Sequence, residues 1–208
     1  AATFTQNAFC AAPVTIAKKH LAQSPPRALI INSGNANAGT GKKGLDDAVQ
    51  TCEWVAKHLD CTTEEILPFS TGVIGEDLPM QNIGSGIDDA ISKLSPDSWM
   101  SVANAIMTTD TIPKAISRQF VLDGNTVTIT GIAKGSGMIC PNMATMLAFV
   151  VTDANVNQAY LQRCLTKAVN KSFNSITVDG ETSTNDACVV VATGKSSAAE
   201  LIGSDDLS

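Results

Sequence analysis

The sequence predicts a mixed α/β (α+β) fold in which helices pack on β-sheets around one main core. The chain has 208 residues, of which 44% are hydrophobic and 16% charged, so it holds enough apolar material for one large core. Only 4% of the residues are aromatic and small residues are common, which favours close packing of helices on sheets. Apolar residues recur at helical spacing in some segments and alternate in others.

The first part of the chain predicts two helices and a buried strand. Pro13 stands in the first turn of a short helix, where the missing N–H of proline costs nothing, and Pro25 ends that helix. The stretch R-A-L-I-I-N-S at 27–33 predicts a buried strand. Residues 45–59 carry apolar side chains at helical spacing and acidic residues in the first turn, which indicates a second helix.

The second part predicts a helix, a hairpin and several further elements. Ser95 is expected to start a helix that leads into W-M-S-V-A-N-A-I-M. Residues 114–134 alternate on both sides of D-G-N, which predicts a β-hairpin with a tight turn. The remaining expected elements are a strand at 145–152, a helix capped by Asn155 that runs to about Phe173, and strands at Ile176–Val178 and Ala187–Ala192.

Composition argues against binding to nucleic acids or membranes. The formal net charge is −6, and an acidic surface repels phosphate backbones. No apolar run approaches the ~20 residues that span a bilayer, and the chain does not open with the pattern of a signal peptide.

The cysteines and histidines predict neither disulfides nor a metal site. No two cysteines form a C-x-x-C pair, and most lie within apolar patterns, so we expect buried thiols in a reducing, cytoplasmic compartment. The six cysteines are Cys10, Cys52, Cys61, Cys140, Cys164 and Cys188. His20 and His58 are expected on the solvent side of helices, far from one another, and no zinc-ligand spacing is present.

A glycine- and asparagine-rich stretch, N-S-G-N-A-N-A-G-T-G-K-K-G at 32–44, has the composition of a phosphate loop. The spacing fails in both registers, because Thr40 stands where a P-loop needs lysine and Lys43 where it needs Ser or Thr. A turn that leaves a strand and lines a pocket is the better interpretation.

Three other polar segments are candidate site loops as well as ordinary turns. S-T-G-V-I-G at 70–75 has the glycine-hydroxyl pairing from which an oxyanion hole is built. M-T-T-D-T at 107–111 either ends a helix or forms a polar pocket wall. D-G-E-T-S-T-N-D at 179–186 favours local side-chain-to-backbone turns.

Residues 134–145 read K-G-S-G-M-I-C-P-N-M-A-T and place turn-forming residues directly before an apolar strand. A threonine hydroxyl is a poor nucleophile unless a base lies beside it. Cutting the bond between Ala144 and Thr145 would free an α-amine, and its pKa of roughly 7.7–8 would let it act as that base. The pattern thus suggests a self-made N-terminal nucleophile, although composition alone fits a threonine that merely begins a strand.

Several motifs in order along the chain resemble one family. They are T-F-T-Q-N-A-F-C-A-A-P-V, N-S-G-N-A-N-A-G-T-G, S-T-G-V-I-G, M-T-T-D-T, K-G-S-G-M, P-N-M-A-T-M-L and V-D-G-E-T-S-T-N-D. Together they are similar to the ornithine acetyltransferase family, the self-cleaving glutamate N-acetyltransferases of arginine biosynthesis. The resemblance implies that the acetyl group moves from N2-acetyl-L-ornithine to L-glutamate through an ester on Thr145, after self-cleavage between Ala144 and Thr145.

The resemblance also implies roles for residues outside the cleavage site. Thr71 and Gly72 match the oxyanion-hole pair of the family. Thr108, Lys134 and Thr145 match substrate-binding residues, and Lys134 is expected to pair with an amino-acid carboxylate. No metal or cofactor is implied, although some family members use acetyl-coenzyme A as an additional acetyl donor.

The implied architecture is a layered sandwich of mixed sheets and helices, similar to N-terminal-nucleophile enzymes but with different connectivity. Residues 1–208 are expected to be a single catalytic domain and a fragment of a longer protein. Residues 1–144 would belong to an α chain and 145–208 would begin a β chain, the two staying together as α2β2. The closing part of the family's β chain, with a substrate-binding glutamate, is absent, so the ornithine pocket is expected to be incomplete.

Two alternatives from other classes remain open. An amidohydrolase or aminopeptidase would use the same threonine nucleophile but pass the acyl group to water. A truncated, non-catalytic domain would bind a small amino acid or a partner chain. Label transfer from acetylornithine separates the two catalytic alternatives, and cleavage before Thr145 separates both from the third.

Overall fold

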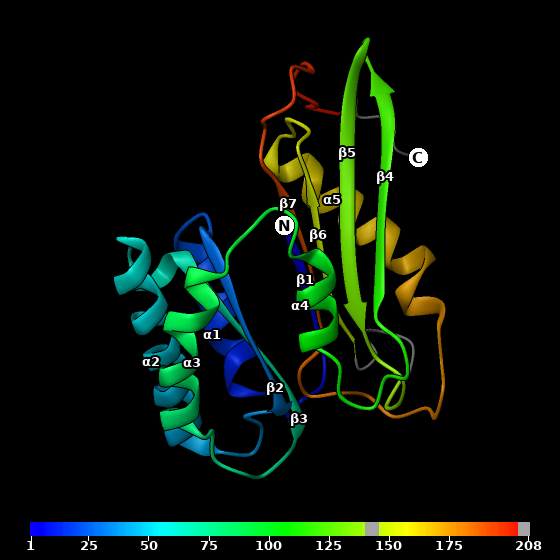
Figure 1. The fold of residues 1–208 in the computed structure, drawn as a ribbon. Helices are drawn as coiled ribbons and strands as arrows, with labels where there is room; N and C mark the ends of the chain where they lie inside the picture. The colour runs from blue at the N-terminus through cyan, green and yellow to red at the C-terminus, as the bar shows by residue number, and fades with distance from the viewer. Residues whose placement is uncertain (140–145, 204–208) are drawn as a thin grey trace.

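The computed structural model describes residues 1–139 and 146–203, and Figure 1 shows how the elements in these ranges are arranged. Two 3₁₀ turns, at Thr63–Glu65 and Phe173–Ser175, connect longer elements. The helices are α1 Ala12–Gln23, α2 Gly41–Leu59, α3 Met80–Ser92, α4 Trp99–Ala105 and α5 Gln158–Lys171. The strands are β1 Ala2–Phe4, β2 Ala28–Asn35, β3 Ile66–Val73, β4 Lys114–Leu122, β5 Asn125–Lys134, β6 Leu147–Thr152 and β7 Ala187–Ala192.

The strands form two sheets of different kinds. β2 and β3 make a two-stranded parallel sheet. The larger sheet has the order β1-β7-β6-β5-β4, in which β6 and β7 are parallel and the other neighbours are antiparallel. β1, at the start of the chain, therefore pairs with β7, near its end, which fixes the N-terminal segment on the larger sheet.

The two sheets pack face to face and helices cover their outer faces (Figure 1). Alternating residues of β3 divide between the faces: Leu67 and Phe69 enter the core between the sheets, whereas Ile66 packs under α2 and α3. On the far side, α5 packs on β6 and β7 through Leu165 and Val169. This arrangement confirms the predicted layered α/β sandwich.

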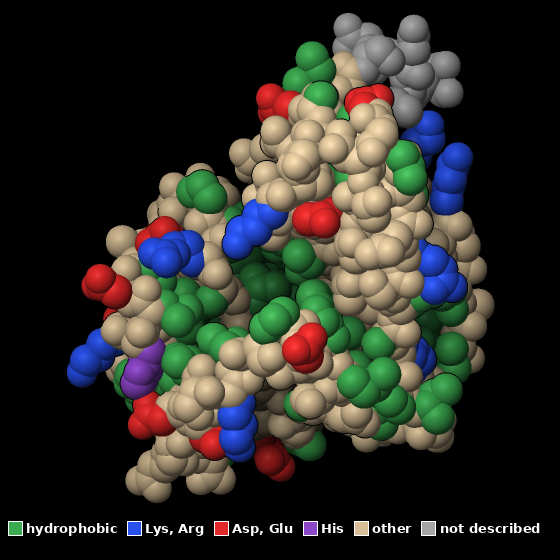
Figure 2. Space-filling model, turned by 45° about the horizontal axis from the view of Figure 1, so that its top comes forward, with side chains coloured by type: hydrophobic (Ala, Val, Ile, Leu, Met, Phe, Trp, Pro, Cys, Tyr) green, Lys and Arg blue, Asp and Glu red, His purple; other side chains and the backbone are tan. Residues whose placement is uncertain are grey.

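The core between the sheets is apolar and closely packed. The rings of Phe69 on β3 and Phe149 on β6 meet edge to face, with centroids 5.1 Å apart. α4 packs against β4 and β5 of the larger sheet and contributes Ala103 and Ile106 to the same cluster. Figure 2 shows a hollow with hydrophobic side chains at its floor on one face of the molecule.

Strand register brings the site segments to one end of the sandwich. Lys134, the last residue of β5, pairs with Leu147 at the start of β6, and Leu147 pairs with Ala187 at the start of β7. Lys134 hydrogen-bonds to Thr71 near the carboxyl end of β3, so the carboxyl ends of β2 and β3 lie at the same end of the sandwich as the end of β5. The ends of β3 and β5 and the starts of β6 and β7 therefore meet there.

Most predicted elements of the first half are confirmed, with shifted boundaries. α1 has a proline in its first turn, as expected. α2 begins at Gly41 rather than Leu45, inside the glycine-rich stretch, so its acidic residues lie beyond the first turn. There Asp46 and Asp47 pair with Lys42 and Lys43 one turn earlier.

The hairpin prediction is also confirmed. β4 and β5 pair over their whole length around Asp123 and Gly124, which have φ of +49° and +79°. Two successive residues with positive φ are the signature of a type I′ turn, for which Asp-Gly is a preferred sequence.

Three predictions about secondary structure are wrong. Ile176–Val178 is not a strand, because it follows a 3₁₀ turn and both valine and isoleucine are exposed. The cap of α5 is Asn157 rather than Asn155, since its side chain accepts the N–H groups of Ala159 and Tyr160. α4 begins at Trp99, later than the expected start at Ser95.

His20 is buried rather than on the solvent side of its helix. Its side chain is 3% exposed, and Nδ1 lies 2.8 Å from the carbonyl oxygen of Ile66 at the start of β3. His58 is exposed on α2 as predicted and contacts Asp88 on α3. His20 thus ties α1 to β3, a role that only the packing of α1 beside that strand creates.

Five of the six cysteines lie in the described ranges, and all five are free thiols. Cys52 and Cys188 are buried, whereas Cys10, Cys61 and Cys164 are partly exposed. Burial raises the pKa of both the Cys52 and the Cys188 thiol to about 12, which keeps them protonated at neutral pH.

Candidate functional site

The centre of the candidate site is the buried ammonium group of Lys134. This side chain is only 3% exposed, and Nζ donates to the hydroxyls of Thr71 at 2.9 Å and Thr108 at 3.0 Å. Burial lowers the pKa of Lys134 from its usual 10.5, while the nearby carboxylates of Asp110 and Asp186 oppose that shift. The structure thus brings together three residues that are separated by up to 63 positions in the sequence.

Asp110 holds the loop after α4, which carries Thr108, against the end of β5. The Asp110 carboxylate accepts the backbone N–H of Gly135 at 2.8 Å and pairs with Lys114 Nζ at 2.5 Å. Burial alone would raise the pKa of Asp110, but the Lys114 ammonium and these N–H groups outweigh it and lower the pKa overall. M-T-T-D-T therefore forms a polar wall of the site and does more than end a helix.

Gly72 lies beside Thr71 where β2 and β3 come closest. Its φ is +135°, and a Cβ at this position would lie 2.2 Å from the carbonyl carbon of Gly34 and 2.5 Å from the nitrogen of Asn35. Glycine is therefore required both by conformation and by space. The close approach holds the Thr71–Gly72 backbone rigidly next to Lys134.

A buried amide fastens the two sheets together beside this group. Asn185 Nδ2 donates to the carbonyl oxygens of Ala36 at 2.6 Å and Ser70 at 2.9 Å. Asn185 precedes β7 of the larger sheet, whereas Ala36 and Ser70 belong to the ends of the smaller one. This contact fixes the distance between Thr71 and the start of β7.

Asp186 follows Asn185 and is almost fully buried, at 1% exposure. Its Oδ1 accepts the backbone N–H of Met146 at 2.8 Å, while Oδ2 has no hydrogen-bond partner within the described residues. Burial raises the pKa of Asp186 to about 7, against the opposing effects of the Met146 N–H, the nearby Ser183 hydroxyl and the Lys134 charge. The sequence motif containing Asp186 had indicated only local turns, and the apolar strand that follows it was the one available sign of burial.

Other residues of the same polar motifs have structural roles. Asp179 accepts the N–H groups of Met138 and Ile139, and this fastens the segment after β5. Asn37 is fully buried and donates to the carbonyl oxygen of Gly44 at 2.9 Å. The glycine-rich stretch at 32–44 therefore builds a turn, as expected.

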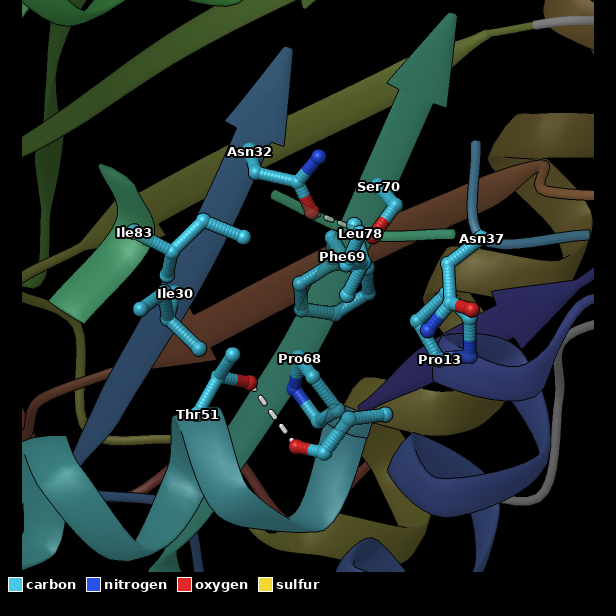
Figure 3. Close-up of a pocket in the computed structure, with 11 residues that line it drawn as sticks. Pro13, Ile30, Asn32, Asn37, Thr51, Pro68, Phe69, Ser70, Leu78 and Ile83 are labelled. Carbon is cyan, nitrogen blue, oxygen red and sulfur yellow. Dashed lines mark hydrogen bonds between the residues drawn. The ribbon is translucent and has the colours of Figure 1, made fainter. Parts of the chain in front are cut away.

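A small pocket lies on the helical side of β2 and β3 (Figure 3). The side chains of Asn32 and Ser70 point toward one another in it from the two strands, and Ser70 Oγ donates to Asn32 Oδ1. Its volume is about 10 Å³, which is at most room for one water molecule. This pocket is therefore not a substrate site, in contrast to the polar cluster around Lys134 on the opposite face of β3.

The raised pKa of Asp186 predicts an unusual dependence of stability on pH. Because the folded chain keeps this proton up to about pH 7 and the unfolded chain releases it near pH 4, stability falls as the pH rises between these values. Asp186→Asn carries no such proton. In a Thr145→Ala background, urea unfolding is expected to show the variant gaining about 2 kcal/mol over its parent from pH 5 to pH 8. A difference that stays constant with pH would contradict the raised pKa.

Six site residues were expected from the sequence. Thr145 and Ala144 lie outside the described residues, and the structure describes the other four, Thr71, Gly72, Thr108 and Lys134. Thr71, Thr108 and Lys134 are in direct hydrogen-bond contact, and Gly72 adjoins them. Met146, directly after Thr145 in the chain, joins the same cluster through Asp186. No helix in the described ranges combines the length and hydropathy needed to cross a bilayer.

Comparison with known proteins gives a consistent result. The ArgJ family model matches residues 1–206. The "Arginine biosynthesis bifunctional protein ArgJ" of Methylococcus capsulatus is 58% identical over 198 residues, which cover 95% of this chain and 48% of that protein. The protein of the same name from Pseudomonas syringae is 53% identical over 201 residues, 97% of this chain and 49% of that protein. The chain thus spans about half the length of these relatives.

Two crystal structures resemble the fold. Arginine biosynthesis bifunctional protein ArgJ from Bacillus halodurans matches with a TM-score of 0.60 and 40% identity, over 69% of this chain and 75% of that one. Ornithine acetyltransferase from Mycobacterium tuberculosis, complexed with ornithine, matches with a TM-score of 0.58 and 33% identity, over 68% of this chain and 75% of that one. Because the family match extends over nearly the whole sequence, this chain belongs to the ArgJ family.

Proposed function

We propose that this chain is part of an ornithine acetyltransferase, which moves the acetyl group of N2-acetyl-L-ornithine to L-glutamate. The observation that carries the proposal is the buried Lys134 ammonium, held by Thr71 and Thr108 at the end of β5 in a chain of the ArgJ family. A desolvated cation beside hydroxyl donors suits the carboxylate that both amino-acid substrates share. The relative complexed with ornithine supports the same substrate class.

The proposed nucleophile is Thr145, which becomes a chain end when the chain cuts itself between Ala144 and Thr145. Its hydroxyl then attacks the acetyl carbonyl, and its own amine takes the hydroxyl proton and passes it to the departing ornithine nitrogen. The resulting ester is attacked by the glutamate amine, which restores the threonine. Support comes from the position of Met146, the next residue, within the polar cluster.

Thr71 and Gly72 are proposed to stabilise the negative oxygen that forms in both acetyl-transfer steps. An oxyanion hole needs donors that do not move when charge develops. The rigid approach of Gly72 to Gly34, and the hydrogen bond that fixes the Thr71 side chain, supply that fixed geometry.

The complete protein is proposed to be cytoplasmic and to hold its α and β pieces together as α2β2. β1 from the first piece pairs with β7 from the second, and this supports pieces that stay associated after a cut before Thr145. Since the relatives are about twice as long, residues beyond this chain are expected to complete the ornithine pocket. Acetyl-coenzyme A is a possible additional acetyl donor, and no metal or other cofactor is proposed.

The proposal is tested on purified full-length protein. Intact mass and N-terminal sequencing are expected to show a piece that begins at Thr145. With acetyl-labelled N-acetylornithine, the label is expected on glutamate. Label released only as acetate would identify a hydrolase instead, and an uncut protein inert toward acetylornithine would make the chain non-catalytic.

Lys134→Met is expected to weaken substrate binding more than it slows the chemical step. The variant keeps the length of the side chain but removes the charge, and a charged hydrogen bond is worth about 1.5–3 kcal/mol. KM for N-acetylornithine should therefore rise roughly 10- to 100-fold with a smaller change in kcat. Lys93→Met, at an exposed lysine on the solvent side, serves as control. Equal changes in kcat and KM would contradict a role in carboxylate binding.

A further inference from the structure

Asp186 lies where two strands of the site, β6 and β7, begin. It directly precedes β7, and Oδ1 accepts the N–H of Met146 at 2.8 Å, just before β6 begins. Met146 is the residue that follows Thr145 in the sequence. A single carboxylate therefore holds the backbone immediately after the proposed cleavage site.

The other oxygen of this carboxylate is buried and unpaired within the described residues. Buried polar atoms almost always have a hydrogen-bond partner, because an unpaired one costs free energy. Asn185, its neighbour, shows what a purely structural residue does in this loop, since its amide donates to two carbonyl oxygens. Among the described residues, Asp186 differs from Asn185 in keeping one oxygen without a hydrogen-bond partner.

Among the described residues, the charge that acts on Asp186 is that of Lys134 on β5. Lys134 is also influenced by the charges of Asp110 and Lys114, which pair with one another. The charges of Asp110 and Asp186 both favour the Lys134 ammonium, while its hydrogen bonds go to the neutral hydroxyls of Thr71 and Thr108. Ionised Asp186 therefore adds to the attraction that Asp110 already exerts on the Lys134 ammonium.

We propose that Asp186 is a positioning residue for the reaction: its Oδ1 fixes the backbone after the nucleophile, and its negative charge holds the Lys134 ammonium in place. This inference rests on the proposed function. It adds a role for Asp186, to which the family resemblance assigned none. The same geometry makes activity depend on the charge state of Asp186, whose pKa of about 7 lies close to neutral pH.

The test compares Asp186→Asn with wild type in full-length protein across pH. Asparagine keeps an oxygen for the Met146 N–H but imitates the protonated carboxyl at every pH. At pH 8 kcat for acetyl transfer is expected to fall about 100-fold, the loss typical of a misplaced reacting group. At pH 5.5, where wild-type Asp186 is itself mostly protonated, the difference should shrink to about fivefold or less. A residue with only a structural role would give the same ratio at both pH values.

Asp153→Asn is the matched control. Asp153 lies just beyond the other end of β6, and its Oδ1 accepts the N–H of Thr128 at the same 2.8 Å. Its substitution is expected to leave kcat unchanged at both pH values. Asp186→Ala removes the hydrogen bond as well as the charge, so its self-cleavage should be slower than that of Asp186→Asn.

Failure of the inference is separable from failure of the proposed function. If wild type transfers acetyl groups and Asp186→Asn matches it at pH 8, or Asp186→Ala cleaves itself at the wild-type rate, the role of Asp186 is wrong. If wild type itself transfers no label to glutamate, the proposed function is wrong. Thermal unfolding of each variant checks folding, and Asp186→Asn should be at least as stable as wild type at pH 8.

Discussion

Thr145→Ala is expected to leave the chain uncut and to abolish acetyl transfer. Alanine has no hydroxyl to attack the preceding carbonyl, so neither the new chain end nor the ester can form. Loss of a nucleophile removes all steps that depend on it, and activity should fall by roughly 10⁴-fold or more. The measurements are the intact mass of purified full-length protein and transfer of labelled acetyl to glutamate.

Thr145→Ser is the matched control, because it keeps both the hydroxyl and the amine. It is expected to cut itself and to retain measurable transfer. The proposed nucleophile is refuted if Thr145→Ala still yields a piece that begins at position 145, or if the uncut variant transfers acetyl at a rate close to that of wild type. The folded state of the variant is checked by its thermal unfolding.

Gly72→Ala is expected to have the second largest effect, through the oxyanion hole. The added methyl group would lie 2.2 Å from the backbone carbon of Gly34, and the φ of +135° disfavours any side chain. β2 and β3 must separate locally, which moves the Thr71–Gly72 backbone away from the reacting carbonyl. Loss of one oxyanion donor typically costs ~10²–10³ in kcat. KM should change less, because Lys134 remains.

The measurement is kcat and KM for N-acetylornithine together with the unfolding temperature. Gly86→Ala on α3 is the control: no atom lies within 4 Å of the added Cβ, and its φ is unexceptional for a helix. This control should be as stable as wild type or more so. If Gly72→Ala lowers stability but leaves kcat intact, Gly72 serves only the packing of the strands.

The sequence predicted local elements best where backbone conformation depends on neighbouring residues. The Asp123-Gly124 turn and the alternation around it specify the β4–β5 hairpin, and Pro13 marks the start of α1. Prediction from the sequence failed where strand-forming residues are not buried in the fold: Ile176–Val178 has such residues, but Ile176 and Val178 are exposed. α3 was not predicted, because Gly84 and Gly86 weaken its helical pattern.

The candidate site divides in the same way. Motif order pointed to Thr71, Gly72, Thr108 and Lys134, and the structure shows these four adjacent to one another. The contributions of Asn185 and Asp186 were not visible, because they depend on the pairing of β6 with β7 and on the distance between the two sheets. Residues that interact across such separations leave no local pattern.

By itself, the sequence determined the mixed α/β class and the hairpin, because each depends on residues close together in the chain, and its series of motifs pointed to the family. Only the tertiary structure decided that His20 is buried, that Lys134 is desolvated and influenced by Asp110 and Asp186, and that Gly72 touches Gly34. The physical reason is that burial, charge pairing and close backbone approach are properties of contacts between distant segments, and these exist only once the two sheets have packed.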